Sequence, residues 1–356
     1  MTPFPGAVHA PERPCYLLPL RWQADSGAED LTAYLRDIAR TCQVVIVDGS
    51  PEDVFVSHHR AWAAFACHLR PDPDLTYRNG KVNGVITGIR VAGGDQVIIA
   101  DDDIRYDDQS LAMVLALLAD ADLVIPQNYY SPLPWYAAWD SARSLINRAF
   151  WMDYPGTMAV RRTAFLRHGC YDGDVLFENL ELIRTLQAGG ARIRAAPHAY
   201  VRRLPPGARH FAGQRVRQAY DSLGQPPRLA AELALLPAIA LTAAVSRYAA
   251  LGCAAAAIAL AETGRRRHGG TAVFPRVIPL LAPAWVAERS VCSWLALACR
   301  LRGGITYAGH RLPRAATPAA VLRRRSQPLR AAGSPEPGPH VRPVAERLDR
   351  RPPAPA

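Results

Sequence analysis

The segment that decides the fold is Asp95-Gln96-Val97-Ile98-Ile99-Ala100-Asp101-Asp102-Asp103. A short run rich in β-branched residues ends abruptly in three consecutive carboxylates. An apolar run of this length is typical of a strand that is buried on both faces, as in a parallel sheet covered by helices. Ligands of open α/β sheets bind beyond the carboxyl ends of the strands, and the three acids follow such an end.

Crowded carboxylates repel one another unless a cation or hydrogen-bond donors offset their charge. Two unit charges about 4 Å apart repel by roughly 1 kcal/mol in water and by several times more near a surface of lower dielectric. A hard divalent cation relieves this repulsion, and Mg²⁺ commonly joins one or two carboxylates to substrate phosphates. The segment therefore predicts a metal that holds a diphosphate. The alternative is a solvated acidic turn at the start of a helix.

The segments on both sides alternate between strand-like and helix-like patterns. Strands are predicted at residues 16–20, 43–47, 95–100 and 123–127. Helices are predicted at 28–40, 51–69 and 110–120, and another passes through Val85, Ile89 and Val91, after the glycine-flanked Lys81. This alternation is typical of a mostly parallel α/β sheet.

Composition narrows the range of partners. The chain of 356 residues carries a net charge of +11, which favours an anionic partner. We expect no nucleic-acid binding, because the basic runs lack interleaved aromatic residues. Residues 1–14 do not resemble a signal peptide, and the seven cysteines are scattered without a CxxC pair, which favours a reducing compartment.

A single lysine, Lys81, occurs among 42 basic residues and lies between Gly80 and Gly84. Arginine does not replace lysine where a compact ammonium must approach a phosphate, so a functional role is one interpretation. Chance survival in an arginine-biased sequence is the other.

Further acids mark candidate sites. The strand at 43–47 ends in Asp48 and then Gly49, which is a common nucleotide contact but equally a common turn. Glu178 and Glu181 begin a predicted helix and share one of its faces. They are either partners of the helix dipole or candidates for a general base.

In this order, these features resemble the family-2 glycosyltransferases, and most of all their membrane-associated, ceramide-glucosyltransferase-like members. The resemblance covers roughly residues 15–222. It rests on six elements: Asp48, Gly80-Lys81-x-Asn83-Gly84, Asp101-Asp102-Asp103, Gly156 to Arg162, Glu178-Asn179-x-Glu181 and Gln214-Arg215-Val216-Arg217-Gln218. The last of these resembles the family's QxxRW element. The resemblance implies the nucleotide-sugar-binding α/β fold called GT-A.

The resemblance also implies roles for individual residues. Donor binding would fall to Asp48, Lys81, Asp101 and Asp102. The metal, Mg²⁺ or Mn²⁺, would be held by Asp103 with Asp101. Arg161, Gln214 and Arg217 would contact the diphosphate and the acceptor, and an acid of the family's Glu-Asp motif would deprotonate the acceptor hydroxyl. In this chain that base would be Glu178 or Glu181, or else Asp174.

Two positions depart from the family pattern. Asn179 stands where the family usually has an aspartate, so the expected base position holds an amide. Gln218 replaces the tryptophan of QxxRW, which argues against processive synthesis.

The composition changes after residue 222. Apolar segments at 229–246 and 248–261, and a second pair at 277–287 and 290–299, predict a membrane-associated helical region over 223–312. A buried soluble subdomain is the alternative. The run Arg265-Arg266-Arg267 favours a cytoplasmic location for the connecting segments and the catalytic domain. Residues 313–356 are Arg- and Pro-rich and predict a disordered tail, and residues 1–14 a loose N-terminus.

The sequence therefore predicts an inverting, metal-dependent glycosyltransferase at the cytoplasmic membrane. It would use a nucleotide-sugar donor and a lipid-linked or glycan acceptor. A nucleotidyltransferase and a non-catalytic, nucleotide-sugar-binding scaffold remain as alternatives.

Overall fold

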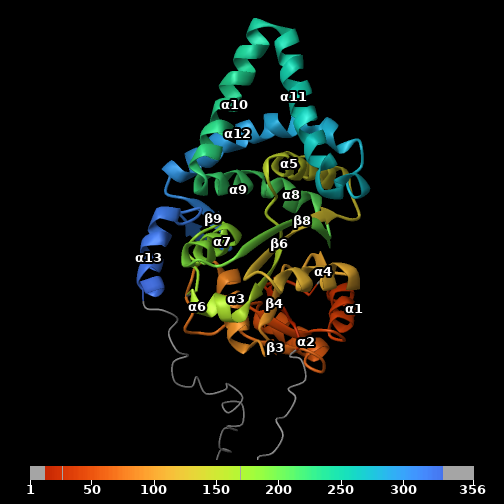
Figure 1. The fold of residues 1–356 in the computed structure, drawn as a ribbon, viewed down its shortest axis with the longest axis vertical. Helices are drawn as coiled ribbons and strands as arrows, with labels where there is room; N and C mark the ends of the chain where they lie inside the picture. Colours follow the sequence, from red (N-terminus) through yellow and green to blue (C-terminus); the bar gives the residue numbers. More distant parts are fainter. Residues whose placement is uncertain (1–12, 26, 169, 332–356) are drawn as a thin grey trace, which may run out of the picture.

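The computed structural model describes residues 13–25, 27–168 and 170–331. Its centre is an eight-stranded sheet in the order β3-β2-β1-β4-β7-β6-β8-β5 (Figure 1). The strands are β1 (Cys15–Leu20), β2 (Gln43–Asp48), β3 (Cys67–Leu69), β4 (Gln96–Ala100), β5 (Ile104–Arg105), β6 (Leu123–Tyr130), β7 (Thr157–Arg161) and β8 (Ile193–Arg203).

The sheet is mostly parallel and has two reversed strands: β7 and the short edge strand β5, which pairs antiparallel with β8. Strands β3, β2, β1 and β4 run parallel to their neighbours, and so do β6 and β8. Strand β7 lies antiparallel between β4 and β6. The prediction of an α/β fold with a mostly parallel sheet flanked by helices is confirmed.

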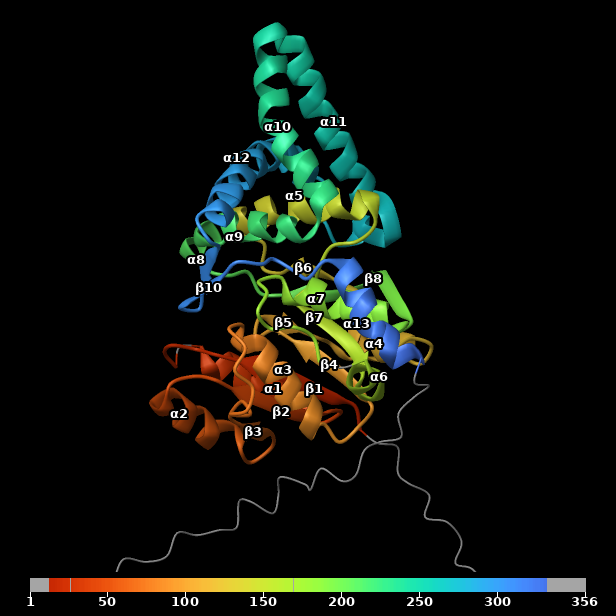
Figure 2. The ribbon, with the colours of Figure 1, turned by 90° about the vertical axis from the view of Figure 1, so that its left-hand side faces the viewer.

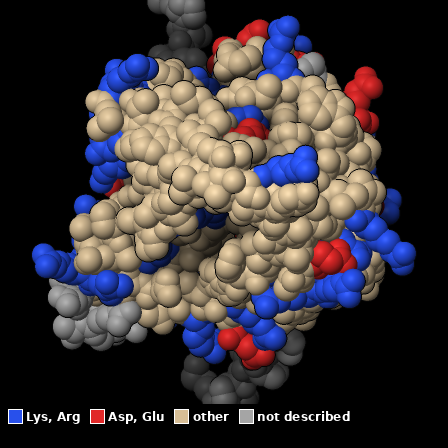
Figure 3. Space-filling model, turned by 90° about the horizontal axis from the view of Figure 1, so that it is seen from above, with Lys and Arg blue, Asp and Glu red and all other residues tan. Residues whose placement is uncertain are grey.

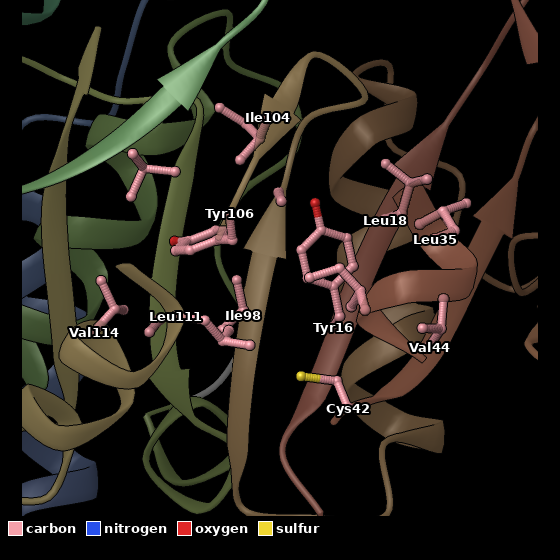
Figure 4. Close-up of a cluster of buried hydrophobic side chains, with 14 of the residues drawn as sticks. Tyr16, Leu18, Leu35, Cys42, Val44, Ile98, Ile104, Tyr106, Leu111 and Val114 are labelled. Atoms are coloured by element: carbon pink, nitrogen blue, oxygen red, sulfur yellow. The ribbon is translucent and has the colours of Figure 1, made fainter. Parts of the chain in front are cut away.

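Helices cover both faces of the sheet and bury two separate apolar clusters. On one face lie α1 (Ala28–Ile38), α2 (Glu52–Trp62) and α4 (Asp108–Leu118); on the other lie α3 (Gly80–Val91), α6 (Arg162–Arg167) and α7 (Glu178–Gly189). Figure 4 shows part of the first cluster, where Leu35 of α1, Tyr16 of β1 and Val114 of α4 are close to fully buried. Burial on both faces explains why the strands read as continuous apolar runs.

The predicted helix at 51–69 is too long. Helix α2 ends at Trp62, and the last three residues of the predicted helix form strand β3, which pairs in parallel with β2. A three-residue edge strand is too short to show its own period in the sequence.

A helical layer and a projecting hairpin lie beyond the sheet (Figures 1 and 2). The layer contains α5 (Trp135–Phe150), α8 (Ala208–Gly213), α9 (Arg215–Tyr220) and α12 (Ala282–Leu301), and the hairpin consists of α10 (Pro226–Val245) and α11 (Arg247–Arg266). The sequence predicts two apolar segments at 277–287 and 290–299, but one helix, α12, covers most of both. Its Pro283 lies in the first turn, where a proline leaves no helical hydrogen bond unmade.

Part of the predicted tail, which starts at residue 313, forms a helix, and a short β-hairpin precedes it. Strands β9 (Ile305–Tyr307) and β10 (His310–Leu312) form a hairpin, and α13 (Ala319–Ala331) packs against α7. The backbone N–H of Phe177 donates to the carbonyl of Ala315 over 2.8 Å, so this segment supports the start of α7. Residues 332–356, the rest of the predicted tail, and residues 1–12 of the predicted loose N-terminus lie outside the described residues.

Asn79 connects the helix that carries Lys81 to the loop before Glu178. It is fully buried and is the N-cap of α3: its Oδ1 accepts from the N–H of Lys81 over 3.2 Å, and its Nδ2 donates to the carbonyl of Val175 over 3.3 Å.

Asn79→Ala therefore removes a cap and leaves a buried carbonyl without its donor. We expect the free energy of unfolding, measured by urea denaturation, to fall by about 2–3 kcal/mol. Ser246→Ala is the control, because Ser246 caps α11 without a comparable tie to another segment. It should cost about 1 kcal/mol. Equal losses in the two variants would show that the tie to Val175 adds nothing.

Candidate functional site

A cavity of about 1200 Å³ opens where β1 and β4 end. Its walls come from the strand ends, from the first turns of α3 and α7, from the end of β8, from α9 and from the turn between β9 and β10. The predicted acids Asp101, Asp102 and Asp103 all line this cavity. The expectation that polar groups gather at this edge of the sheet therefore agrees with the structure.

Lys81 lies between two carboxylates that come from distant parts of the chain. Its Nζ is 2.6 Å from Asp101 Oδ1 and 2.9 Å from Glu178 Oε1. Burial alone would lower the pKa of Lys81, but the two carboxylates outweigh this effect and hold the pKa above its ordinary value. The only lysine of the chain is thus a fixed positive charge inside the acidic cluster.

Arg203, at the end of β8, neutralises the acids from the other side. Its Nε donates to Asp103 Oδ2 over 2.8 Å, and its Nη2 is 3.5 Å from Asp101 Oδ2. The indole N–H of Trp22 donates to Asp102 Oδ2 over 2.5 Å. Neither Arg203 nor Trp22 could be predicted from the sequence, because neither belongs to a motif and both reach the acids only through the fold.

Position 156, directly after Pro155, has room only for a glycine. A Cβ atom at Gly156 would lie 2.6 Å from Asp101 Oδ2 and 3.2 Å from the guanidinium carbon of Arg203. Any larger residue would push these two side chains apart.

Asp103 keeps one oxygen available for a cation. Its Oδ1 is buried and has no hydrogen-bond partner among the described residues. Burial raises the pKa of Asp103 to about 6; Arg203 opposes this shift, while Asp101 and Asp102 add to it. A divalent cation would supply the missing partner, so the residues present fit a metal.

The two candidate bases lie in different surroundings. Glu178 lines the cavity, whereas Glu181 is fully buried and does not line it. One oxygen of Glu181 accepts from the backbone N–H of Thr317 over 2.6 Å, which gives it a structural contact. Asn179 lines the cavity, and its Nδ2 donates to the carbonyl of Pro155 over 2.9 Å.

Asp48 and Arg161 do not line the cavity. Asp48 is fully buried and its Oδ2 accepts from His58 Nδ1 over 2.7 Å and from His68 Nε2 over 3.2 Å. Burial alone would raise the pKa of Asp48, but the hydrogen bonds from His68, Ser50 and His58 outweigh it and hold the pKa below its ordinary value. The carboxylate of Asp48 thus has its hydrogen-bond partners inside the protein and does not face the cavity in which a nucleotide sugar would bind.

The carboxylate of Asp48 and the two imidazoles also place potential ligand atoms within 4.8 Å of one another. They form a second group, apart from the acids of the cavity, that could hold a metal.

Arg161 lies at the other end of β4. It pairs with Gln96, the first residue of that strand, in the antiparallel register. Its Nη1 is 3.0 Å from Asp95 Oδ2, and its Nη2 donates to the carbonyl of Ala119 over 2.8 Å. The predicted diphosphate contact is therefore replaced by a structural ion pair.

Gln214 and Arg217 both line the cavity, as expected for the QxxR segment. Arg217 Nη2 donates to Gln214 Oε1 over 2.9 Å, and its guanidinium carbon is 5.2 Å from the ring centre of Tyr307. Tyr307 comes just before the β9–β10 turn, in which Ala308 and Gly309 have φ angles of +49° and +85°. Two successive positive φ values are typical of the two-residue hairpin turn, and they bring this turn to the cavity wall.

Asp221 is a cavity acid that no predicted motif includes. Its Oδ1 is buried without a hydrogen-bond partner among the described residues. Burial raises its pKa to about 7; Arg217 opposes this shift and Glu178 adds to it.

The chain was compared with known protein families and with curated protein sequences. Residues 28–178 match the family described as Glycosyl transferase family 2. No curated protein sequence matches the chain.

Solved structures with similar folds include a mannosyltransferase from Pyrobaculum calidifontis in complex with GDP-Man and Mn²⁺. It is 18% identical with a TM-score of 0.45, and the match covers 91% of this chain and 84% of that chain. Glucosyl-3-phosphoglycerate synthase from Mycobacterium tuberculosis, in complex with Mn²⁺, UDP and phosphoglyceric acid, is 16% identical with a TM-score of 0.37, covering 56% of this chain and 74% of that chain.

The family match extends from the start of α1 to Glu178 and includes every strand from β2 to β7. The matched segment includes Lys81 on α3 and the three acids that follow β4. Residues 28–178 therefore match glycosyltransferase family 2, and the mixed α/β sheet flanked by helices is the fold that the resemblance to GT-A proteins implies.

Proposed function

We propose that the chain transfers a sugar from a nucleoside-diphosphate donor to an acceptor hydroxyl, with inversion at the anomeric carbon. The observation that carries this proposal is the cluster of Lys81, Asp101 and Glu178, which faces the same cavity as Asp103. The family match supports glycosyl transfer over the alternative of a nucleotidyltransferase.

Donor binding falls to the acidic end of the cavity. Asp103 and Asp101 would hold Mg²⁺ or Mn²⁺, and the unpartnered Oδ1 of Asp103 supports this assignment. When bound, the cation neutralises charge on the diphosphate leaving group. Lys81 and Arg203 balance the acids, while Arg217 offers a guanidinium to the diphosphate from the opposite wall.

Glu178 is the base in this proposal. The ammonium of Lys81, 2.9 Å away, holds the carboxylate of Glu178 at the cavity wall, where it can accept a proton from the acceptor hydroxyl. General-base assistance of this kind is typically worth about 10²- to 10⁴-fold in rate. Attack from the side opposite the diphosphate inverts the anomeric carbon.

The α10–α11 hairpin supports a membrane-bound enzyme. Arg247 is the only charged residue between Leu233 and Ala261, and large apolar side chains along the hairpin are exposed, including Leu241, Val245, Tyr248 and Leu251. An 18-residue stretch of helix α10 has a mean hydropathy of 1.7, and only 6% of this stretch is buried inside the protein. A 20-residue helix is about 30 Å long, close to the thickness of the hydrocarbon core.

Charges surround the base of this hairpin. The run Arg265-Arg266-Arg267 lies at the end of α11, and Figure 3 shows Lys and Arg side chains around the edge of a largely uncharged surface. Arginines suit the headgroup layer of the cytoplasmic side. We therefore place the catalytic domain at the cytoplasmic face, with an acceptor delivered by the membrane.

The proposed domain division keeps residues 15–222 as the catalytic domain and 223–312 as the membrane-associated region. Both parts contribute to the cavity, because Arg228, Arg289 and Tyr307 line it together with the acids. The membrane-associated region thus also completes the site.

Asp103→Asn keeps the shape of the side chain but removes its charge. Binding of UDP or GDP in the presence of Mn²⁺, measured by titration calorimetry, should weaken at least about tenfold, which corresponds to 1.4 kcal/mol. EDTA should weaken binding to the wild-type protein but not to the variant. Asp108→Asn, at an exposed position at the start of α4, is the control. Binding that is equal with and without EDTA in the wild type would contradict the metal role.

Glu178→Gln should preserve donor binding but lower turnover by about 10²- to 10⁴-fold, because an amide cannot take the proton. Turnover is measured as nucleotide release from nucleotide sugars in the presence of membrane lipids. Glu181→Gln is the matched control, since Glu181 does not line the cavity. Loss of turnover in Glu181→Gln alone would show that the base is misassigned. Donor binding without turnover in the wild type would favour a scaffold.

Replacing Leu241, Val245, Tyr248 and Leu251 by serine removes the exposed apolar surface of the hairpin. Co-flotation with phosphatidylcholine vesicles containing phosphatidylglycerol should fall at least about a hundredfold, because each large apolar side chain contributes about 1.5 kcal/mol or more on burial. Leu166→Ser, on α6 and also exposed, is the control and should leave flotation unchanged. Undiminished flotation of the fourfold variant would exclude the hairpin as the anchor.

A further inference from the structure

Arginines from three helices line the end of the cavity that lies under the hairpin. Arg217 belongs to α9, Arg228 to the first turns of α10 and Arg289 to α12. Figure 2 shows α9 and α12 between the sheet and the α10–α11 hairpin. The proposed mechanism assigns no role to Arg228 or Arg289.

Of these three arginines, Arg289 is the one whose guanidinium lacks, in the described segments, a hydrogen-bond partner at a buried nitrogen. Its side chain lines the cavity although the residue is only 3% exposed, and its Nη1 has no hydrogen-bond partner within the part of the chain that the structure describes. The guanidinium carbon is 5.1 Å from the ring centre of Trp285, which is a weak partner. Burial lowers the pKa of Arg289 to about 10, so the group stays charged near pH 7. A buried charge without a partner is costly unless a ligand supplies one.

The acids near Arg289 do not cancel this charge. Glu232 has its own partners: it accepts from Arg228 Nε over 2.9 Å and from Ser293 Oγ over 2.9 Å. Asp221 lines the same end of the cavity, but its raised pKa of about 7 keeps it partly protonated near neutral pH. This end of the cavity therefore has a net positive character.

The location separates this region from the donor. The acids that would hold the metal belong to β4 and the residues after it, whereas Arg228 and Arg289 belong to the helices at the base of the hairpin. Glu178 lines the same continuous cavity. An acceptor held at this end would thus lie in the space that the proposed base faces.

We propose that Arg289, with Arg228, binds an anionic group of the acceptor, such as a phosphate. This inference rests on the proposed function, because it identifies a chemical class of acceptor for the same site. Guanidinium groups suit phosphate oxygens, which accept paired, charge-assisted hydrogen bonds. The anion can belong to a lipid headgroup or to a soluble phosphorylated acceptor.

The test measures anion binding separately from glycosyl transfer. Inorganic phosphate and dodecyl phosphate are titrated into the full chain in a neutral detergent, with the donor site filled by UDP or GDP and Mn²⁺ and again without nucleotide. Arg289→Gln should weaken the binding of both anions at least about tenfold, since a charge-assisted hydrogen bond is lost. Arg289→Lys should retain part of the affinity, and Arg302→Gln, at an exposed position at the end of α12, should retain all of it.

Each outcome decides a separate question. Equal anion affinity in the wild type and in Arg289→Gln, or the same affinity for dodecyl maltoside as for dodecyl phosphate, would overturn the proposal. Tighter binding of dodecyl phosphate than of inorganic phosphate, lost in Arg289→Gln, supports a lipid-linked acceptor. Equal binding of the two anions, lost in the same variant, supports a soluble one.

Nucleotide binding provides the control for folding. Arg289→Gln should bind nucleotide and Mn²⁺ like the wild type; if it does not fold, Arg228→Gln replaces it and should weaken anion binding in the same direction. Absence of nucleotide binding in the wild type would contradict the proposed function, while the anion titration without nucleotide still tests this inference.

Discussion

The balance of charge around Asp101 is the constraint on which the site depends. Three consecutive carboxylates at the end of a buried strand would repel one another, yet the protein places Lys81 on one side of them and Arg203 on the other. The lysine also contacts Glu178, so a single ammonium connects the donor acids to the candidate base. Oδ1 of Asp103 remains without a partner, which leaves the cluster able to accept one more cation.

The rest of the fold positions these groups. Asn79 caps the helix of Lys81 and also contacts the loop before Glu178, so both ends of the Lys81–Glu178 pair are fixed by one side chain. The segment around Ala315 and Thr317 supports the start of α7 from outside the sheet. Residues that follow the family-matched segment thus hold the proposed base in place and complete the cavity wall.

The sequence predicted the parts of the structure that follow from local pattern. Buried apolar strands, their alternation with helices and the acids at the end of β4 all have a period or a motif that can be seen in the chain. The edge strand β3 and the single helix α12 were missed, because a three-residue strand has no visible period and prolines in a first turn resemble a break. The prediction of a disordered tail from residue 313 fails for α13, whose first residues lie in an Arg- and Ala-rich stretch of weak apolar periodicity.

Motifs are poor predictors of a residue's role where the fold decides which way its side chain faces. Asp48 ends a strand as expected, but two histidines from α2 and β3 enclose its carboxylate. Arg161 follows a strand that runs antiparallel to β4, so it lies at the wrong end of the sheet for a diphosphate. Asp221 and Arg289 could not be predicted, because their importance comes from burial without a partner, and burial is a property of the folded chain.

The most direct measurement of the central claim is the location of Mn²⁺ by anomalous scattering in crystals grown with a nucleoside diphosphate. Our account predicts a peak at the carboxylates of Asp103 and Asp101, with the diphosphate beside it. A peak at the group formed by Asp48, His58 and His68 instead, or a diphosphate bound away from the acids that follow β4, would contradict it.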